Sequence, residues 1–464
     1  MGNKVLIEAR DLAYSYDNAA GAVFSGASFT VYAGDKAALL GDNGSGKTTL
    51  LRLLAGELEP PAGRLLNRGA SVFLLKQEDA ADGGLSAEAW LLEALGGGWE
   101  ELPRVAGAAA SLGFAPAELA RPVGTFSGGE RKMLAITAGL LRAPDLYLLD
   151  EPTNYLDGAG MARLAAALRG YRGGFIVVSH DRAFLDACVG KVLELRRSEF
   201  AVYSGDYTAY AGQKAAEFAS ASRKKEKMER EIAGLRAMER NYRDWGAAKE
   251  KEKKGAPDKG FIGARAARLQ KRSALAAERA RGKIDELERE KPFVEKARRV
   301  LPPAAGGAFL EARGLGATVG RRELFRDLSF YIKSGERLCL EGGNGAGKST
   351  LMRILAGELA AGAGELRRSG AARLFYMPQF RPPAAPGARG ADFFPGALRQ
   401  AGCTMLDHLG ADGELLFRPL EELSEGQRRK VELARFLVNG ADIALLDEPT
   451  THQDIRSVGV LEEA

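Results

Sequence analysis

Two glycine-rich stretches decide the fold of this 464-residue chain: GDNGSGKT at residues 41–48 and GGNGAGKS at residues 342–349. Both fit the pattern G-x-x-x-x-G-K-[ST], in which glycines let the loop curl so that its backbone N–H groups face phosphate oxygens. A helix that follows such a loop adds a partial positive charge at its N-terminus. A single match can arise by chance. Two matches, each between a short apolar run and a helix-forming run, predict two phosphate-binding loops for ATP.

Within each loop, the basic and hydroxyl side chains have separate expected roles. Lys47 and Lys348 are expected to reach the β- and γ-phosphates of ATP, while Thr48 and Ser349 offer hydroxyl oxygens to Mg²⁺. The loop residues predicted to bind ATP are Gly41, Asn43, Gly44, Ser45, Gly46, Lys47, Thr48 and Thr49 in the first copy, and Gly342, Asn344, Gly345, Ala346, Gly347, Lys348, Ser349 and Thr350 in the second.

A pair of carboxylates ends a second apolar run in each half of the chain. The runs are DLYLLDEP at 145–152 and DIALLDEP at 442–449. Because a buried carboxylate without a partner is costly, a metal ion is the simplest explanation. Asp150 and Asp447 are therefore predicted to lie near Mg²⁺. Glu151 and Glu448 are predicted to orient and polarise the attacking water.

Three further polar residues end apolar runs. His180 follows the run FIVVS, and we predict that it contacts the γ-phosphate, although a lone histidine at a strand end is more often a satisfied core residue. Gln77 and Gln379 end FLLKQ and FYMPQ, where an amide can sense the metal or the water. Both glutamines are predicted to belong to the ATP and metal sites.

The motifs occur twice in the same order, at nearly constant separation. Lys47 and Lys348 are 301 residues apart, and Asp150 and Asp447 are 297 apart. This regularity indicates a duplicated domain. We expect a first domain at 1–210, a basic linker at 211–304 and a second domain at 305–464.

Each repeated domain is expected to have an α/β fold. The runs KAALLG at 36–41 and RLCLEG at 337–342 are predicted to be buried strands that enter the phosphate loops. Strands that alternate with helices predict a largely parallel sheet, with ligands at the carboxyl ends of the strands.

Composition limits the setting of the protein. No apolar run reaches the length of about 18 to 20 residues that a membrane helix needs. The three scattered cysteines favour neither a disulfide framework nor a zinc site, so a reducing cytoplasm fits best.

The net charge is only +5, but residues 211–300 hold 26 Lys or Arg and 15 Asp or Glu. The basic character therefore belongs to the linker.

The linker is expected to fold as an antiparallel pair of helices. Apolar residues recur every three or four positions on both sides of a turn near 247–262, and Lys291-Pro292 is expected to end the second helix. The first stripe is Met228, Ile232, Leu235, Met238, Tyr242 and Trp245, and the second is Leu269, Ala276, Ala280, Ile284 and Leu287.

The end of this hairpin is a candidate nucleic-acid surface. Residues 259–272 contain no acidic residue, and aromatic residues flank the basic ones. Such a pattern is typical of a surface that contacts phosphate backbones and stacks on bases. A solvated helical spacer remains the alternative. The residues predicted to contact RNA are Lys259, Phe261, Arg265, Arg268, Lys271 and Arg272.

Together these motifs resemble the ATP-binding cassette family. Its second glycine-rich motif corresponds here to FSGGE at 126–130 and LSEGQ at 423–427. The resemblance implies that the two domains pair within one monomeric chain. ATP would then lie between Lys47 and Ser424 and between Lys348 and Ser127. The signature residues expected to bind ATP on this basis are Ser127, Gly128, Gly129, Ser424 and Gly426.

Three departures from the family pattern stand out. Glu425 places an acid where the family usually has glycine, beside the site that uses Lys47. Tyr16 is well placed to stack on adenine, whereas the second domain offers only Val319. A second histidine equivalent to His180 would be expected near position 477. Either the second domain is truncated before it, which is the interpretation we favour, or the second site works without that histidine.

Two cassettes, a basic helical linker and no membrane segment most resemble the ABC-F class, and LSEGQ and KGFIGARAARLQKRS most resemble its antibiotic-resistance branch. The resemblance implies an ATPase whose linker contacts rRNA and P-site tRNA near the peptidyl-transferase centre of the ribosome. A general translation factor, the energising subunit of a membrane transporter and a DNA-repair-type ATPase are the alternatives. No rule connects the linker residues to a particular drug.

Overall fold

The computed structural model describes residues 4–16, 22–42, 44–75, 84–196, 200–255, 261–290, 309–320, 322–333, 335–343, 345–370, 372–379, 387–450 and 453–463. For the helical residues 245–255 and 261–270 it describes the backbone alone. The chain divides into two compact units: Met1–Tyr210 together with Arg298–Ala464, and Ala211–Ala297. We call 1–210 and 305–464 the first and second cassettes, and the pair of helices between them the hairpin.

The first cassette is built on a six-stranded sheet. All neighbouring strands are parallel except the last pair. Two of its inner strands, at 146–150 and 174–178, are buried along their whole length, which explains why they are unbroken apolar runs in the sequence. The strand order is β5 (Val72–Leu75), β6 (Leu146–Asp150), β7 (Gly174–Val178), β3 (Lys36–Leu40), β8 (Lys191–Leu195) and β9 (Phe200–Ser204).

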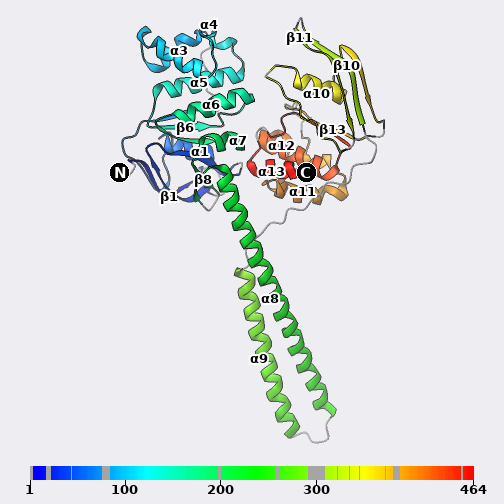
Figure 1. Cartoon of the computed structure of the whole chain (residues 1–464). Coiled ribbons are helices and arrows are strands. Elements are labelled where there is room, and N and C mark those ends of the chain that lie inside the picture. Colours follow the sequence, from blue (N-terminus) through cyan, green and yellow to red (C-terminus); the bar gives the residue numbers. More distant parts are fainter. Residues whose placement is uncertain are drawn as a thin grey trace. The chain divides into compact units, whose positions relative to one another are not determined.

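A second, antiparallel sheet and a set of helices complete the first cassette (Figure 1). The sheet contains β2 (Phe24–Tyr32), β1 (Val5–Tyr14) and β4 (Ala62–Asn67). The helices are α1 (Lys47–Leu54), α2 (Ala87–Leu95), α3 (Leu102–Ser111), α4 (Pro116–Leu119), α5 (Gly128–Arg142), α6 (Gly158–Gly170) and α7 (Arg182–Cys188), with 3₁₀ turns at Trp99–Glu101 and Val123–Thr125.

The second cassette repeats part of this plan. Its antiparallel sheet contains β11 (Arg322–Lys333), β10 (Phe309–Val319) and β12 (Ala363–Arg368), and its parallel pair is β13 (Leu374–Met377) and β14 (Ile443–Leu446). The helices are α10 (Lys348–Ala356), α11 (Arg399–His408), α12 (Glu425–Asn439) and α13 (Ile455–Glu463). Short 3₁₀ turns lie at Gly390–Phe393, Gly396–Leu398, Gly413–Phe417 and Leu420–Glu422. The predicted α/β class with two cassettes is confirmed.

One strand prediction was wrong. The run at 337–342 is not a strand, and Leu338 within it is 59% exposed. In the first cassette the corresponding strand β3 is held between β7 and β8. Among the described residues of the second cassette, no strand follows β14, so nothing offers 337–342 a hydrogen-bonding neighbour. Apolar sequence alone did not form the strand.

The predicted hairpin is present as two long helices, α8 (Tyr207–Gly255) and α9 (Phe261–Glu290), which run side by side in Figure 1. Their apolar stripes meet in a small core of Met228, Ile232, Ile284 and Leu287, with Leu235 partly buried against it. Ion pairs also cross between the helices, from Arg236 to Glu288 and from Arg281 to Glu239. The helix α9 is described as far as Glu290, and the helix end predicted at Lys291-Pro292 lies outside the described residues.

The turn of the hairpin is shorter than predicted. We expected it near 247–262, but α8 continues to Gly255 and α9 begins at Phe261. Residues 249–254 are all Lys or Glu, which are good helix formers, and Glu250 precedes Lys254 by one helical turn. The helix propensity of these residues explains why α8 reaches Gly255.

A search of the described helices for an apolar segment long enough to cross a membrane found none.

Candidate active site

The first phosphate loop takes a conformation that requires glycine. Gly44 and Gly46 have φ angles of 80° and 95°, in the left-handed region. A Cβ atom on Gly46 would lie 2.6 Å from Val23 Cγ1 and 2.8 Å from Phe24 Cδ1. Gly347, its counterpart in the second cassette, has a φ angle of 96°. The glycine spacing in the motif therefore follows from backbone geometry and close packing.

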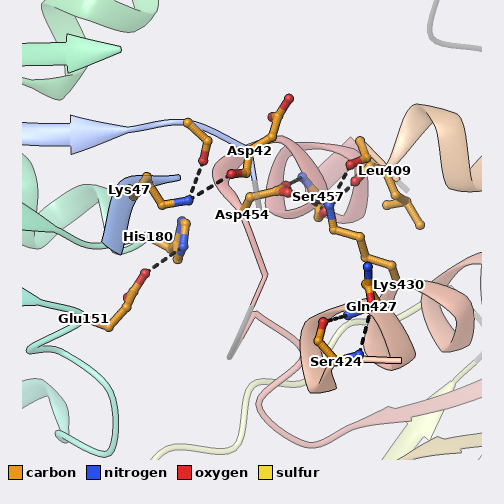
Figure 2. A network of polar contacts seen from close by, with 12 residues as sticks. Asp42, Lys47, Glu151, His180, Leu409, Ser424, Gln427, Lys430, Asp454 and Ser457 are labelled. Atoms are coloured by element: carbon orange, nitrogen blue, oxygen red, sulfur yellow. Dashed lines mark hydrogen bonds and ion pairs between the residues drawn. The ribbon is translucent and has the colours of Figure 1, made fainter. Parts of the chain in front are cut away.

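The first-loop lysine is held against its own loop. Lys47 is only 8% exposed, and its Nζ donates hydrogen bonds to the carbonyl oxygens of Gly41 (2.8 Å) and Asp42 (3.1 Å), as Figure 2 shows. Burial lowers the pKa of Lys47, and the charge of Glu151 opposes that shift. An ammonium group has three N–H donors, so one remains available for a phosphate oxygen.

The hydroxyl group of the next residue, Thr48, contacts the carboxylate of Asp150. Thr48 Oγ1 donates a hydrogen bond of 2.7 Å to Asp150 Oδ2, and Asp150 is 5% exposed. Burial raises the pKa of Asp150, and the hydrogen bond from Thr48 opposes that shift. A buried carboxylate beside a hydroxyl is the oxygen-rich environment that Mg²⁺ prefers. In the same loop, Ser45 Oγ is buried and has no hydrogen-bond partner among the described residues.

The predicted catalytic pair of the first cassette is in contact. His180 Nε2 lies 2.8 Å from Glu151 Oε1, and both side chains are largely buried (Figure 2). Glu151 itself has a φ angle of 47°, a left-handed conformation that costs a non-glycine residue about 1–3 kcal/mol. Such strain is typical of functional sites, because the surroundings must hold it in place. His180 therefore holds the side-chain carboxylate of Glu151, a residue whose backbone already has an unusual conformation.

These residues surround one cavity of about 410 Å³, a size suited to a small-molecule ligand. Tyr16 stands at its edge, 45% exposed, with its hydroxyl 3.0 Å from Thr49 Oγ1. The lining residues are Tyr16, Val23, Gly44, Gly46, Lys47, Thr48, Thr49, Asp150, Glu151, Asn154, Val178 and His180. The predicted residues thus lie together, at the ends of β1, β6 and β7 and in the first phosphate loop.

The second cassette assembles a similar but not identical group. Lys348 Nζ donates to the carbonyl oxygens of Gly342 (2.7 Å) and Gly343 (3.0 Å). Gln379 Nε2 donates to Glu448 Oε2 at 2.9 Å, and Glu448 has a φ angle of 47°, like Glu151. Asp447 Oδ2 is buried and has no hydrogen-bond partner among the described residues. A buried carboxylate oxygen without a protein partner at this place fits a cation-binding role.

Each signature serine caps a helix. Ser127 Oγ accepts a hydrogen bond from the N–H of Glu130 at the start of α5, and Ser424 Oγ accepts one from the N–H of Gln427 at the start of α12. A Cβ atom on Gly128 would meet no atom within 4 Å. The position equivalent to Gly128 in the second cassette can therefore carry Glu425 without steric conflict.

Several predicted site residues lie outside the described part of the chain. They are Asn43, Gln77, Asn344 and Lys259, together with the side chains of Phe261, Arg265 and Arg268. Lys271 and Arg272, on α9, are exposed. The roles assigned to individual residues remain predictions.

The structure also adds residues that the motifs did not single out. Asn154 and Val23 line the first cavity. In the second cassette, Arg429 on α12 is 5% exposed and donates hydrogen bonds to the backbone carbonyls of Gln379 and Glu448. The only feature of the sequence that could have identified Arg429 is its position two residues after the LSEGQ motif.

Comparison with known proteins agrees with this geometry. The family model described as ABC transporter matches residues 24–154 and 325–451. The chain is 32% identical to the tylosin resistance ATP-binding protein TlrC of Streptomyces fradiae, covering 95% of this chain and 89% of that protein. It is 29% identical to the ribosome protection protein VmlR of Bacillus subtilis, covering 97% and 80%. It is 30% identical to the energy-dependent translational throttle protein EttA of Mycobacterium tuberculosis, covering 93% and 82%.

The chain belongs to the ATP-binding cassette family, within its F class, and carries two cassettes. It is an ATPase.

Proposed function

We propose that this ATPase acts on the ribosome in the cytoplasm and protects it from antibiotics, its hairpin contacting rRNA and P-site tRNA near the peptidyl-transferase centre. Two relatives with matches along nearly the whole chain are named for ribosome protection and tylosin resistance. The hairpin is the observation that carries the proposal, because a nucleotide switch alone has no use for paired helices of 49 and 30 residues.

The surface of the hairpin has the chemistry of an RNA contact. A hollow of about 550 Å³ lies between α8 and α9 on the side of the turn. Apolar side chains line it, among them Leu235, Met238 and Leu275, and Arg272, Arg279 and Lys283 add positive charge. Met238 and Leu275 are 56% and 48% exposed. Apolar surface beside basic groups suits stacked bases and backbone phosphates.

In the proposed cycle, the chain's own residues prepare ATP for hydrolysis. Lys47 and Lys348 bind the phosphates, while Glu151 and Glu448 orient the attacking water and accept its proton. His180 keeps Glu151 in place. Thr48 with Asp150 would hold Mg²⁺ in the first cassette and Ser349 with Asp447 in the second, helped by Gln77 and Gln379. When bound, the ion neutralises charge that develops on the phosphate oxygens.

We further propose that the two cassettes pair within one chain. Ser424 would then complete the site of Lys47, and Ser127 that of Lys348. The free N–H groups at the starts of α5 and α12 suit an anion. Binding of ATP would close the pair and hydrolysis would open it, which gives the ribosome-bound state a limited lifetime.

Expression in a susceptible host tests the proposal. Strains carry the unaltered protein, or a variant in which residues 247–262 are replaced by a short glycine-serine turn. A matched control carries Lys224→Ala and Lys225→Ala on the arm of the hairpin. We expect the unaltered protein and the control to raise the inhibitory concentration of at least one ribosome-targeting drug, and the shortened variant, with normal ATPase activity, to raise none.

A general translation factor is the second candidate, since the relative EttA is named as a translational throttle. If no drug is affected but the protein alters the rate of translation in a cell extract, this candidate is favoured over protection. If the protein instead co-purifies with a membrane protein after mild detergent extraction, the transporter alternative is favoured and the ribosomal proposal fails.

A further inference from the structure

The carboxyl ends of β13 and β14 carry the catalytic residues of the second cassette, and their hydrogen-bond ladder stops there. The strands pair in register up to Met377 and Leu446, and the N–H of Asp447 still bonds to the carbonyl of Met377 at 2.9 Å. The next residue on β13's side is Pro378, which has no N–H to continue the ladder. The carbonyl groups beyond this point need another donor.

Arg429 supplies those donors. Its Nη1 donates to the carbonyl oxygens of Pro378 (2.8 Å) and Gln379 (2.9 Å). Its Nη2 donates to those of Asp447 (3.1 Å) and Glu448 (2.6 Å). One planar guanidinium thus holds four backbone carbonyls, two on each chain segment. This fork fixes the distance between the backbone that carries Gln379 and the backbone that carries Glu448.

Both held segments bear the reacting side chains. Gln379 Nε2 bonds to Glu448 Oε2, so the amide and the carboxylate depend on the same spacing. Glu448 also has the left-handed φ angle of 47°, and the bond from Nη2 to its carbonyl holds that conformation directly. The guanidinium comes from α12, the helix that Ser424 caps. Arg429 therefore connects the signature helix to the carboxylate of its own cassette.

The first cassette differs at the matching positions. Counting from the signature serines, Arg429 corresponds to Lys132, and counting from the glutamines, Pro378 corresponds to Lys76. Lys132 is likewise buried, at 9% exposure. An ammonium is a compact point charge with three donors, so it cannot bridge four carbonyls as a planar fork does. The first cassette holds Glu151 through His180 instead.

We propose that Arg429 is a positioning residue for ATP hydrolysis in the second cassette, setting Glu448 and Gln379 in their reactive arrangement without touching the nucleotide. The substitution of choice is Arg429→Lys, which keeps a buried cation of similar length and copies the residue of the first cassette. Arg428→Lys is the matched control, since Arg428 is the exposed neighbour on the same helix.

The experiment uses the full chain in a Glu151→Gln background, so that steady-state hydrolysis reports the second cassette. We measure kcat and KM for ATP, and the thermal unfolding temperature without nucleotide. We expect Arg429→Lys to lower kcat roughly ten- to a hundredfold, the size of effect that a misplacement of about 1 Å produces, with little change in KM or in unfolding temperature. Arg428→Lys should change none of the three.

Two results would overturn the proposal. One is a folded Arg429→Lys protein whose kcat equals that of its parent, since the fork would then be dispensable for the reaction. The other is a loss of something besides the catalytic rate. A variant that unfolds would show that Arg429 serves stability, and a variant whose KM rises with unchanged kcat would show that it serves ATP binding. Neither result would bear on the ribosomal proposal, because the assay contains no ribosomes.

Discussion

A buried ion pair distinguishes the second cassette at the scale of single residues. Lys430 and Asp454 are 2% and 1% exposed and form an ion pair, and Asp454 Oδ1 accepts a hydrogen bond from the N–H of Ser457 at 2.8 Å (Figure 2). Burial alone would raise the pKa of Asp454, but the charge of Lys430 and the hydrogen bonds from Lys430 and Ser457 together outweigh it and hold the pKa below its ordinary value. Met133 occupies the position of Lys430 in the first cassette.

We predict that Lys430→Met destabilises the protein by about 3–5 kcal/mol at neutral pH, because it leaves the Asp454 carboxylate buried without its partner. Lys430→Met with Asp454→Asn should recover most of that loss. Urea unfolding measures both. If the single variant is as stable as the unaltered protein, the pair does not have the energetic role assigned here.

The same pair predicts a pH dependence. Because the folded-state pKa of Asp454 lies below its unfolded value, its contribution to stability is present above the unfolded pKa and is lost as the pH falls through the folded one. The destabilisation by Lys430→Met should accordingly shrink in acid, where the lone carboxyl can be protonated. A penalty that grows on acidification would contradict this sign.

The residues that the sequence singled out within motifs lie together. Lys47, from the phosphate loop, and Glu151 and His180, from strand ends, line one cavity, while their roles remain predictions. Arg429 and Lys430 could not be identified in the same way. They follow Arg428 in an unbroken basic run, and only the packing of α12 decides that Arg428 faces solvent while its two successors are buried.

At the scale of elements, α7 joins the first active site to the base of the hairpin helix. The helix α7 starts directly after His180, with Asp181 as its N-cap. Further along α7, Asp186 Oδ1 and Oδ2 accept hydrogen bonds of 2.7 Å from the N–H and the hydroxyl of Thr208 in the first turn of α8. A displacement of His180 on hydrolysis would therefore reach the first turn of α8.

If the protein acts on the ribosome as proposed, ribosomes should stimulate its ATP hydrolysis. We predict that Asp186→Ala leaves hydrolysis by the protein alone close to normal but reduces that stimulation roughly five- to tenfold, the size of a typical coupling between sites. Asp206→Ala is the control, because Asp206 caps the same turn through the N–H of Ala209 without involving α7. Equal loss of stimulation in both variants would show that only the capping of α8 matters.

The two elements that sequence patterns misplaced have different causes. The apolar run at 337–342 has the composition of a strand, but a strand needs neighbours that pattern alone does not supply. The turn predicted near 247–262 was placed too widely, because the alternating Lys and Glu residues of its first half favour helix. In both places, pairing or local propensity overrode the expected boundary.

At the scale of the whole molecule, the two cassettes have the same motifs but different supports for their carboxylates. Glu151 is held by His180, and Glu448 by Gln379 and the backbone that Arg429 fixes. The duplication was evident from the spacing of Lys47 and Lys348. The proposed contacts of the hairpin with RNA depend on a partner, so no pattern within the chain can define them.

Trapping on ribosomes tests the central claim most directly. We predict that the full chain with Glu151→Gln and Glu448→Gln, which should bind ATP without hydrolysing it, co-sediments with ribosomes in a sucrose gradient containing ATP. With ADP, or with Lys47→Met and Lys348→Met added, it should stay at the top of the gradient. If the double glutamine variant binds ATP and still sediments free of ribosomes, the proposed ribosomal function is wrong.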